Sequence, residues 1–277
     1  MGPEDWPPDV GAGRSVVILG AGIAGMVAAY EMSRLGYQCT LLEAQPAAGG
    51  RVKTLRSGDT FSETDSQQTC RFDAGEELYF NAGPSRIAQH HERLLGYCRE
   101  FGVALETFTN DNRGAWLQSP TALGGQPQVA RTLLADSRGG IAELLSTAIN
   151  QGALDDELTA ADQANILAML REFGDLDIDN RYAGTPRAGY PGHENSGSGR
   201  RGELLPPRSL EEIVTEFVWS LRLTSSQGFD QQPTMLPPVG GLARLVRALA
   251  AKAASDLVVN ARVTEIRKAD AGVRVVY

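Results

Sequence analysis

Cysteine is scarce in this sequence and long apolar runs are missing from it. Three cysteines in 277 residues (Cys39, Cys70 and Cys98) are too few for a disulfide framework, and their spacing does not match a zinc site. No apolar stretch approaches the roughly 20 residues that a membrane-spanning helix needs. Lysine and arginine number 26 against 34 aspartates and glutamates, and the net charge of −8 argues against nucleic acid as a partner.

The N-terminus carries no sign of a targeting segment, and glycine is in excess. Residues 1–13 are rich in proline and glycine and lack the basic and apolar regions of a signal peptide. Two locations are therefore compatible with the sequence: the cytoplasm, or secretion followed by removal of a signal peptide. Glycine makes up 31 of 277 residues, about 11% against a typical ~7%. That excess predicts many tight turns or close approaches of the backbone.

The chain begins with a strand, a helix and a second strand. Residues 15–20 (SVVILG) form a short β-branched run, which predicts a fully buried strand. Apolar residues at helical spacing predict a helix over 23–35, which Gly36 ends. A second buried strand is predicted over 39–42. This order is a βαβ unit, which implies a parallel sheet with a right-handed crossover.

Helices are predicted in the middle of the chain and strands at its end. The spacing of apolar residues predicts helices over 85–101, 129–150 and 160–173, the last with Thr159 as its candidate N-cap. A Ser209/Glu212 capping box predicts the start of another helix, and a further helix is predicted from Gly240-Gly241 through Ala253. Short strands are predicted at 257–259, 263–266 and 273–277. Residues 181–202 are predicted to be a loop, and Cys39, Cys98, Trp116, Phe217 and Trp219 are predicted to be core residues.

This order predicts an α/β fold in which a nucleotide-binding domain is discontinuous. We expect an N-terminal tail (1–14), a Rossmann-like domain built from 15–80 and 236–277, and a mainly helical portion from 81–235 that includes the 181–202 loop. The sequence shows no internal repeat.

The first strand and helix are joined by a dinucleotide-binding fingerprint. In GxGxxG, Gly20 permits a tight turn, Gly22 lets the backbone approach a pyrophosphate, and Gly25 brings helix and sheet together. Ile23 and Ala24 lie in the first helical turn, whose free N–H groups favour phosphate. Glu43, followed by Ala44, ends the second strand, where a carboxylate can accept hydrogen bonds from ribose hydroxyls. The alternative is a glycine-rich turn that binds no ligand.

A second glycine pair distinguishes between the two common dinucleotides. Gly49-Gly50-Arg51 follows Glu43 closely, and it indicates another close approach to an extended ligand, with a guanidinium to offset phosphate charge. NAD domains do not need this segment, so it favours FAD. The alternative is a surface turn with a solvated arginine.

These segments resemble a known family. The run VVILGAGIAGMVAAYEMSRLGYQCTLLEAQPAAGGRV (residues 16–52) is similar to the FAD-binding start of the flavin amine oxidases, which include L-amino-acid oxidases, monoamine oxidases and tryptophan monooxygenases. Residues 231–242 (QQPTMLPPVGGL) resemble the return into the FAD domain in bacterial members. The segment from 260 to 277 also matches, and the resemblance implies that the backbone of Val263 contacts the adenine.

The resemblance also implies where a substrate binds. Residues 81–87 (NAGPSRI), followed by His91, are similar to the segment of L-amino-acid oxidases whose arginine binds the substrate carboxylate, which here is Arg86, with Gly83, Pro84 and Ser85 before it. A planar guanidinium can bind a carboxylate through two parallel hydrogen bonds. His91 or its neighbour His90 is a candidate acceptor for the ammonium proton. The alternatives are a solvated or intrahelical arginine and histidines of the helix surface.

The implied reaction is FAD-dependent oxidative deamination of L-amino acids to 2-oxo acids, with O2 as the final acceptor. Family members continue for about as long again as this chain. The implied partners are therefore an amino-acid substrate, O2 and a C-terminal partner chain, in a homo- or hetero-oligomer, with no metal. The alternatives are a monoamine oxidase or amino-acid monooxygenase of the same family, and a non-catalytic FAD-binding subunit.

Overall fold

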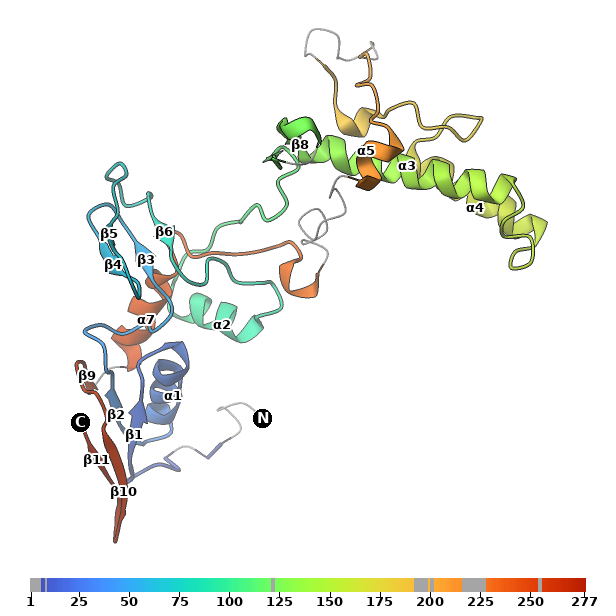
Figure 1. Ribbon diagram of the computed structural model, residues 1–277. Helices are drawn as coiled ribbons and strands as arrows, with labels where there is room; N and C mark the ends of the chain where they lie inside the picture. The colour runs from blue at the N-terminus through green and yellow to red at the C-terminus, as the bar shows by residue number, and fades with distance from the viewer. Residues whose placement is uncertain are drawn as a thin grey trace. The chain divides into compact units, whose positions relative to one another are not determined.

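The protein divides into two compact units (Figure 1). The computed structural model describes residues 6–7, 9–120, 123–191, 199, 202–215, 228–253 and 256–277. Unit 1 comprises Met1–Thr109 and Pro233–Tyr277, and unit 2 comprises Asn110–Gln232.

Unit 1 contains most of the strands. Its elements are β1 (Ser15–Leu19), α1 (Ile23–Arg34), β2 (Gln38–Leu42), β3 (Thr54–Leu55), β4 (Thr60–Ser62), β5 (Gln67–Thr69), β6 (Phe80–Asn81), α2 (Glu92–Glu100), α7 (Ala243–Ala253), β9 (Leu257–Val258), β10 (Glu265–Ala269) and β11 (Gly272–Val276). The described residues of unit 2 form β7 (Trp116–Leu117), β8 (Gln128–Val129), α3 (Ala130–Asn150), α4 (Ala160–Gly174), α5 (Leu210–Thr215) and 3₁₀ turns at Leu123–Gly125, Pro186–Ala188 and Phe229–Gln231.

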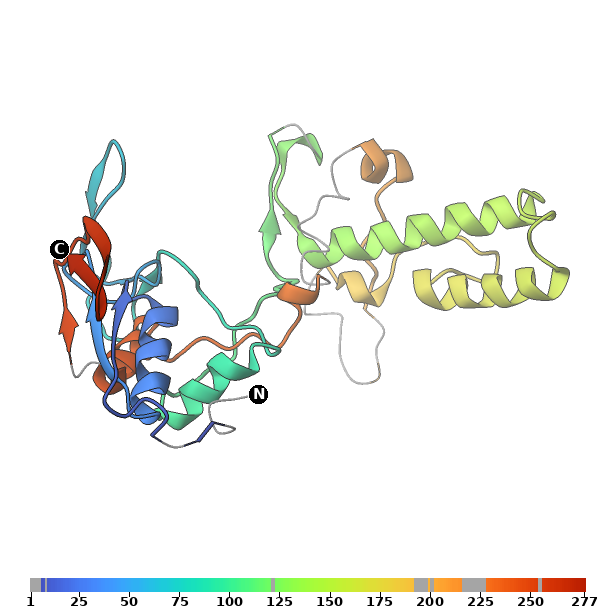
Figure 2. The same cartoon turned by 90° about the horizontal axis from the view of Figure 1, so that it is seen from below.

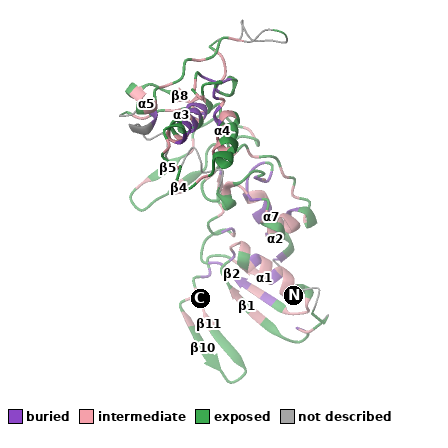
Figure 3. Cartoon of the chain, turned by 90° about the vertical axis from the view of Figure 1, so that its right-hand side faces the viewer, coloured by how far each residue is buried: buried purple, intermediate pink, exposed green. Residues whose placement is uncertain are grey.

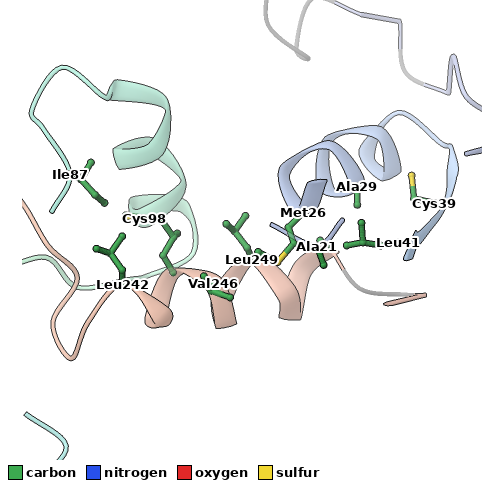
Figure 4. Close-up of a cluster of buried hydrophobic side chains, with 12 residues drawn as sticks. Ala21, Met26, Ala29, Cys39, Leu41, Ile87, Cys98, Leu242, Val246 and Leu249 are labelled. Atoms are coloured by element: carbon green, nitrogen blue, oxygen red, sulfur yellow. The ribbon is translucent and has the colours of Figure 1, made fainter. Parts of the chain in front are cut away.

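The centre of unit 1 is a parallel sheet in the order β1-β2-β9. Val17 lies opposite Thr40 in β2, and Leu41 lies opposite Leu257 in β9. This confirms the predicted βαβ unit and its parallel sheet. Helix α1 packs on β1 and β2 and against α7. Figure 4 shows the shared core, in which Met26 of α1 lies near Leu249 of α7.

Strand β1 differs from its prediction because one of its faces is not covered. Val17 is 39% exposed and Leu19 is 46% exposed, whereas the sequence predicted a fully buried strand. The β1-β2-β9 order also leaves β1 at one edge of this sheet. An apolar run of this kind is typical of a parallel strand with cover on both faces. Within the described residues, only the face of β1 that carries Ile18 packs against the core cluster.

The predicted helix over 85–101 is wrong in its first half. Helix α2 begins only at Glu92, after His91 as its N-cap. The preceding residues are extended, because Ile87 and Leu236 exchange backbone hydrogen bonds of 3.3 and 2.8 Å. Ile87 and Cys98 enter the same core as Leu242, which is why residues 81–109 lie in unit 1 and the unit boundary differs from the one expected at residue 81.

The N-terminus of α7 is held by side chains from distant strands. The hydroxyl oxygen of Thr54 accepts from the amide of Ala243 at 3.0 Å, and Asn81 Oδ1 accepts from that of Leu242 at 3.2 Å. Thr54 Oγ1 also donates to Asn81 Oδ1 at 2.7 Å. These contacts satisfy N–H groups that a helix start leaves without intrahelical partners. They attach the returning chain to the β3–β6 pair.

Unit 2 is built on the antiparallel helices α3 and α4, which lie side by side in Figures 1 and 2. As predicted, Thr159 caps α4. Its hydroxyl accepts from the amide of Asp162, whose carboxylate accepts from that of Thr159. The Thr159 hydroxyl also donates to the Asp162 carboxylate at 2.6 Å, and this hydrogen bond, together with the one from the Thr159 amide, lowers the pKa of Asp162. Gly174 allows the close approach, since a Cβ there would lie 2.4 Å from that of Ala142.

A buried carboxylate fixes the chain around α3. Asp136 Oδ1 accepts from the Tyr182 hydroxyl at 2.8 Å, and Oδ2 accepts from the amide of Arg208 at 3.3 Å. Burial is the main cause that raises the pKa of Asp136. The Tyr182 ring fits because residue 139 is glycine, where a Cβ would lie 2.2 Å from the ring. Two polar contacts and one glycine therefore hold distant segments on α3.

Several remaining predictions can be compared with the structure. Cys39 and Cys98 are buried, as predicted, whereas Trp116 is 70% exposed, because its two-residue strand pairs only with β8. Phe217 and Trp219 lie outside the described residues. The Ser209/Glu212 capping box is present at the start of α5. Figure 3 shows that the β10–β11 hairpin is largely exposed. Among the described residues, no helix has the length and apolarity to cross a membrane.

Candidate functional site: a glycine-lined path across unit 1

The path begins at the turn between β1 and α1. Gly20 has a φ of 94°, a conformation that L side chains rarely adopt, and its amide donates to Leu42 O at 2.7 Å. A Cβ on residue 25 would lie 2.0 Å from the carbonyl oxygen of Gly20, so only glycine fits there. Nothing lies within 4 Å of where a Cβ would stand on Gly20 or Gly22. The turn is therefore tight on the side of the helix and open on the other.

Helix α1 presents its N-terminus at this turn. Its N-cap is Gly22, which has no side chain to accept from the first amides. Ile23, Ala24 and Gly25 form the first turn, where the N–H groups and the helix dipole favour an anion. This arrangement fits the phosphates of a dinucleotide.

Glu43 lies next to the same turn. It is 7% exposed, and its Oε2 accepts from the amide of Ala21 at 2.7 Å while Oε1 accepts from that of Gln45 at 2.8 Å. A carboxylate has about four lone-pair directions, so it keeps capacity for hydroxyl donors. The exposed Ala44 follows it. The backbone carbonyl of Glu43 accepts from the amide of Ala261, which brings the half-buried Val263 within two residues of this point.

The second glycine pair lies against the first. Gly49 donates its amide to Ala21 O at 2.8 Å, and a Cβ on Gly50 would lie 3.5 Å from Gly22 Cα. Gly49 and Gly50 both have positive φ, at 124° and 58°. The prediction that both pairs approach one extended ligand therefore has a geometric basis. Arg51, which follows, is exposed.

The path continues to the turn that carries the candidate substrate arginine. A Cβ on Gly83 would lie 2.1 Å from the carbonyl oxygen of Arg51, and the amide of Ala82 donates to Lys53 O at 2.9 Å. Gly83 therefore lets the turn that contains it pack directly on the backbone of residues 51–53. The structure brings together three segments that lie far apart in the sequence, around residues 20–25, 49–51 and 83–86.

Arg86 is half-buried at the end of this path. Its Nη1 donates to Ser85 Oγ at 3.0 Å, and its guanidinium carbon lies 5.4 Å from the centroid of the Phe108 ring. The exposed residues Gly83 and Pro84 form the turn before it. The sequence analysis missed Phe108, because nothing in its own segment marks an aromatic residue as the neighbour of an arginine that lies 22 positions earlier.

The histidines lie just beyond. The rings of His90 and His91 are 4.5 Å apart in a T-shaped arrangement, and the amide of His91 donates to Ala88 O at 2.9 Å. His91 is exposed and is the N-cap of α2, so it lies at the start of a helix and not within one as the sequence predicted. Among the described residues, no group of three histidine, cysteine or acidic side chains has the arrangement of a metal site.

Comparison with known proteins defines the family. A family model described as flavin containing amine oxidoreductase matches residues 23–277. The match spans most of the chain, and the protein therefore belongs to this family. Membership confirms the predicted flavin cofactor, FAD, and the Rossmann-like α/β fold class.

This chain matches only part of the length of each relative. An L-amino-acid oxidase of Pseudechis australis is 28% identical over 264 residues, which are 95% of this chain and 47% of that protein. One of Gloydius halys is 38% identical over 103 residues, 37% of this chain and 17% of that protein. Both are snake proteins, whereas the resemblance of residues 231–242 pointed to bacterial members. The chain spans at most about half the length of these curated relatives.

Among solved structures, wild-type putrescine oxidase bound to putrescine has a TM-score of 0.45 and 14% identity to this chain. The similarity covers 95% of this chain and 54% of that one. At this TM-score and sequence identity, the two sites cannot be compared.

Proposed function

We propose that unit 1 binds FAD along the glycine-lined path and that the complete protein catalyses oxidative deamination of L-amino acids. The continuity of the path from Gly20 to Arg86 is the observation that supports this most strongly. Its first part fits a diphosphate and ribose, and its last part offers a guanidinium to a carboxylate. The overall reaction converts an amino acid, O2 and water into a 2-oxo acid, ammonia and hydrogen peroxide.

In this proposal the cofactor-binding residues are those of the path. The amides of Gly22, Ile23, Ala24 and Gly25 would hold the diphosphate, and Glu43 and Ala44 would hold the adenosine ribose. The remaining contacts come from Gly50, Arg51, Gly83, Pro84, Ser85, Arg86 and Val263. The bound flavin supplies the electron acceptor for amine oxidation.

The substrate is held and prepared by side chains of this chain. Arg86 binds the carboxylate and thereby fixes the direction of the amino acid's Cα–H bond. His91 accepts the ammonium proton, since only the neutral amine has the lone pair that amine oxidation uses. Residues 85–91 therefore contain both groups that these steps need: the hydrogen-bond donor for the carboxylate and the acceptor for the ammonium proton.

The substitution Arg86→Ala tests the substrate assignment. In the complete oxidase we expect kcat/KM for the preferred amino acid to fall about a hundredfold or more, because a carboxylate loses a charged partner. Arg86→Lys keeps the charge without the paired hydrogen bonds, and its kcat/KM should lie between those of the unchanged enzyme and Arg86→Ala. The matched control is Arg93→Ala, in an exposed arginine on α2, and it should change neither activity nor flavin content.

Three outcomes contradict the proposal in different ways. Unchanged oxidation of amino acids by Arg86→Ala removes the carboxylate assignment. Oxidation of amines without a carboxylate, at equal efficiency, indicates a monoamine oxidase. Yellow protein that releases no peroxide with any of the twenty amino acids indicates a non-catalytic FAD-binding subunit.

We also propose that the active form contains further polypeptide, carried by a second chain or by a longer form of this one. Its support is the exposed edge strand β1, whose Val17 and Leu19 form an apolar surface on the central sheet. Native mass spectrometry of the peroxide-forming species tests this. A fully active monomer with the mass of these 277 residues would contradict it.

A further inference from the structure

The guanidinium of Arg86 lies over an aromatic ring. Its central carbon is 5.4 Å from the centroid of Phe108, within the roughly 6 Å at which a cation and a ring face attract each other. Both side chains are half-buried, so water screens the contact less than at a fully exposed site.

The position of the ring is set by backbone pairing. The amide of Phe108 donates to Met235 O at 2.9 Å, and Met235 also bridges to Ala88 on its other side. Met235 is 2% exposed, so it forms a buried centre between two extended segments. Arg86 precedes one of these segments by one residue, and Phe108 lies on the other. Backbone hydrogen bonds therefore hold the ring near Arg86.

Resting on the function proposed above, we propose that Phe108 is a positioning residue that orients Arg86 for the substrate carboxylate. An arginine has a long flexible side chain, and ordering it when substrate arrives weakens binding. The ring restricts the position of the guanidinium before substrate binds, and Nη1 is held by its hydrogen bond to Ser85 Oγ at 3.0 Å. Phe108 therefore acts on substrate affinity and has no contact with the reacting bonds.

Substitution of the ring in the complete oxidase tests this. With the amino acid that yields most peroxide, we expect Phe108→Leu to raise KM about tenfold and to leave kcat within about twofold. The deaminated analogue of that amino acid keeps the carboxylate but has no amino group to oxidise. Its dissociation constant should rise by the same factor. Phe108→Trp, which keeps a ring face, should restore both values.

The control is Phe101→Leu. Phe101 is also half-buried, but it contacts the rings of Tyr30 and Tyr97. We expect neither KM nor the dissociation constant to change in this variant. A rise equal to that of Phe108→Leu would show a general effect of lost packing and would overturn the inference.

A double substitution separates this inference from the proposed function. In an Arg86→Ala background, Phe108→Leu should add nothing to the loss of carboxylate affinity. An unchanged KM in Phe108→Leu, together with a large loss in Arg86→Ala, overturns the positioning role alone. An unchanged KM in Arg86→Ala overturns the proposed function itself.

A packing role would have its own signature. If Phe108→Leu gives no flavin-loaded protein, Phe108→Met provides a second variant without a ring but with an unbranched side chain that adapts to the same space. Loss of flavin loading in both would show that the ring serves the fold, and the inference would fall.

Discussion

Two glycines of the candidate site in unit 1 face backbone oxygens, whereas the helical glycines of unit 2 face side chains. Gly25 meets the carbonyl oxygen of Gly20, and Gly83 meets that of Arg51. In unit 2, Gly139 meets the ring of Tyr182, and Gly174 meets Ala142 Cβ. A close backbone approach leaves amides and open space on the far side, where a ligand can bind. An approach by a side chain fills that space and contributes to packing only.

The largest effect is expected from a methyl group at Gly25. Gly25→Ala would place Cβ 2.0 Å from a backbone oxygen that cannot rotate away, so we expect a loss of about 3 kcal/mol or more and no flavin-loaded protein. Gly96→Ala in α2 is the control, since nothing lies within 4 Å of its Cβ position, and it should stabilise the helix by up to about 1 kcal/mol. Equal flavin binding by both variants would contradict the expected clash between residue 25 and the Gly20 carbonyl oxygen.

The corresponding change in unit 2 should be smaller. Gly139→Ala forces the Tyr182 ring to move, which we expect to lower stability by about 2 kcal/mol. Hydrogen exchange should increase in peptides from α3 and from residues 175–191, while unit 1 keeps its flavin. A loss of flavin in this variant would show that the two units do not respond separately.

Removal of one hydroxyl tests the buried carboxylate of unit 2. Tyr182→Phe leaves Asp136 Oδ1 without its 2.8 Å donor, and we expect a loss of about 1–2 kcal/mol in chemical denaturation. Tyr190→Phe is a control with the same atom removed elsewhere in this unit. No difference between the two variants would mean that Asp136 does not depend on that donor.

The long-range cap of α7 is expected to contribute less. Thr54→Val keeps the shape of the side chain but removes the acceptor of the Ala243 amide, at a cost of about 1 kcal/mol. Thr159→Ala in unit 2 removes a local cap of similar energy. Hydrogen exchange should localise the first loss to α7 and the second to α4, and exchange of the reverse pattern would contradict these assignments.

A pH series should give the mildest difference. Because burial raises the folded-state pKa of Asp136, its contribution is fully present below the ordinary aspartate pKa of ~3.9 and is lost as pH rises through the higher folded value. Asp136→Asn should flatten this fall in the stability of unit 2 between acid and neutral pH. An identical slope in both proteins would assign the dependence to other groups.

Local patterns predicted the parts of the fold that local interactions determine. The βαβ unit and the Thr159 and Ser209 caps depend on residues close in sequence. The helix over 85–101 was predicted too long because Ile87 pairs with Leu236, a partner that lies far along the chain. Arg86 was identified from its own segment, but Phe108 was not, since their proximity depends on Met235 between two extended segments.

The chain leaves and re-enters unit 1 at neighbouring points. The amide of Phe108 donates to Met235 O, close to the points where the chain leaves unit 1 after Thr109 and returns to it at Pro233. The Asn110 side chain donates to Gln231 O just beyond these points. Because its two ends are adjacent, the intervening segment can be exchanged by recombination without interrupting unit 1. A short linker joining residues 108 and 235 would therefore give a minimal form of unit 1 onto which other segments can be grafted.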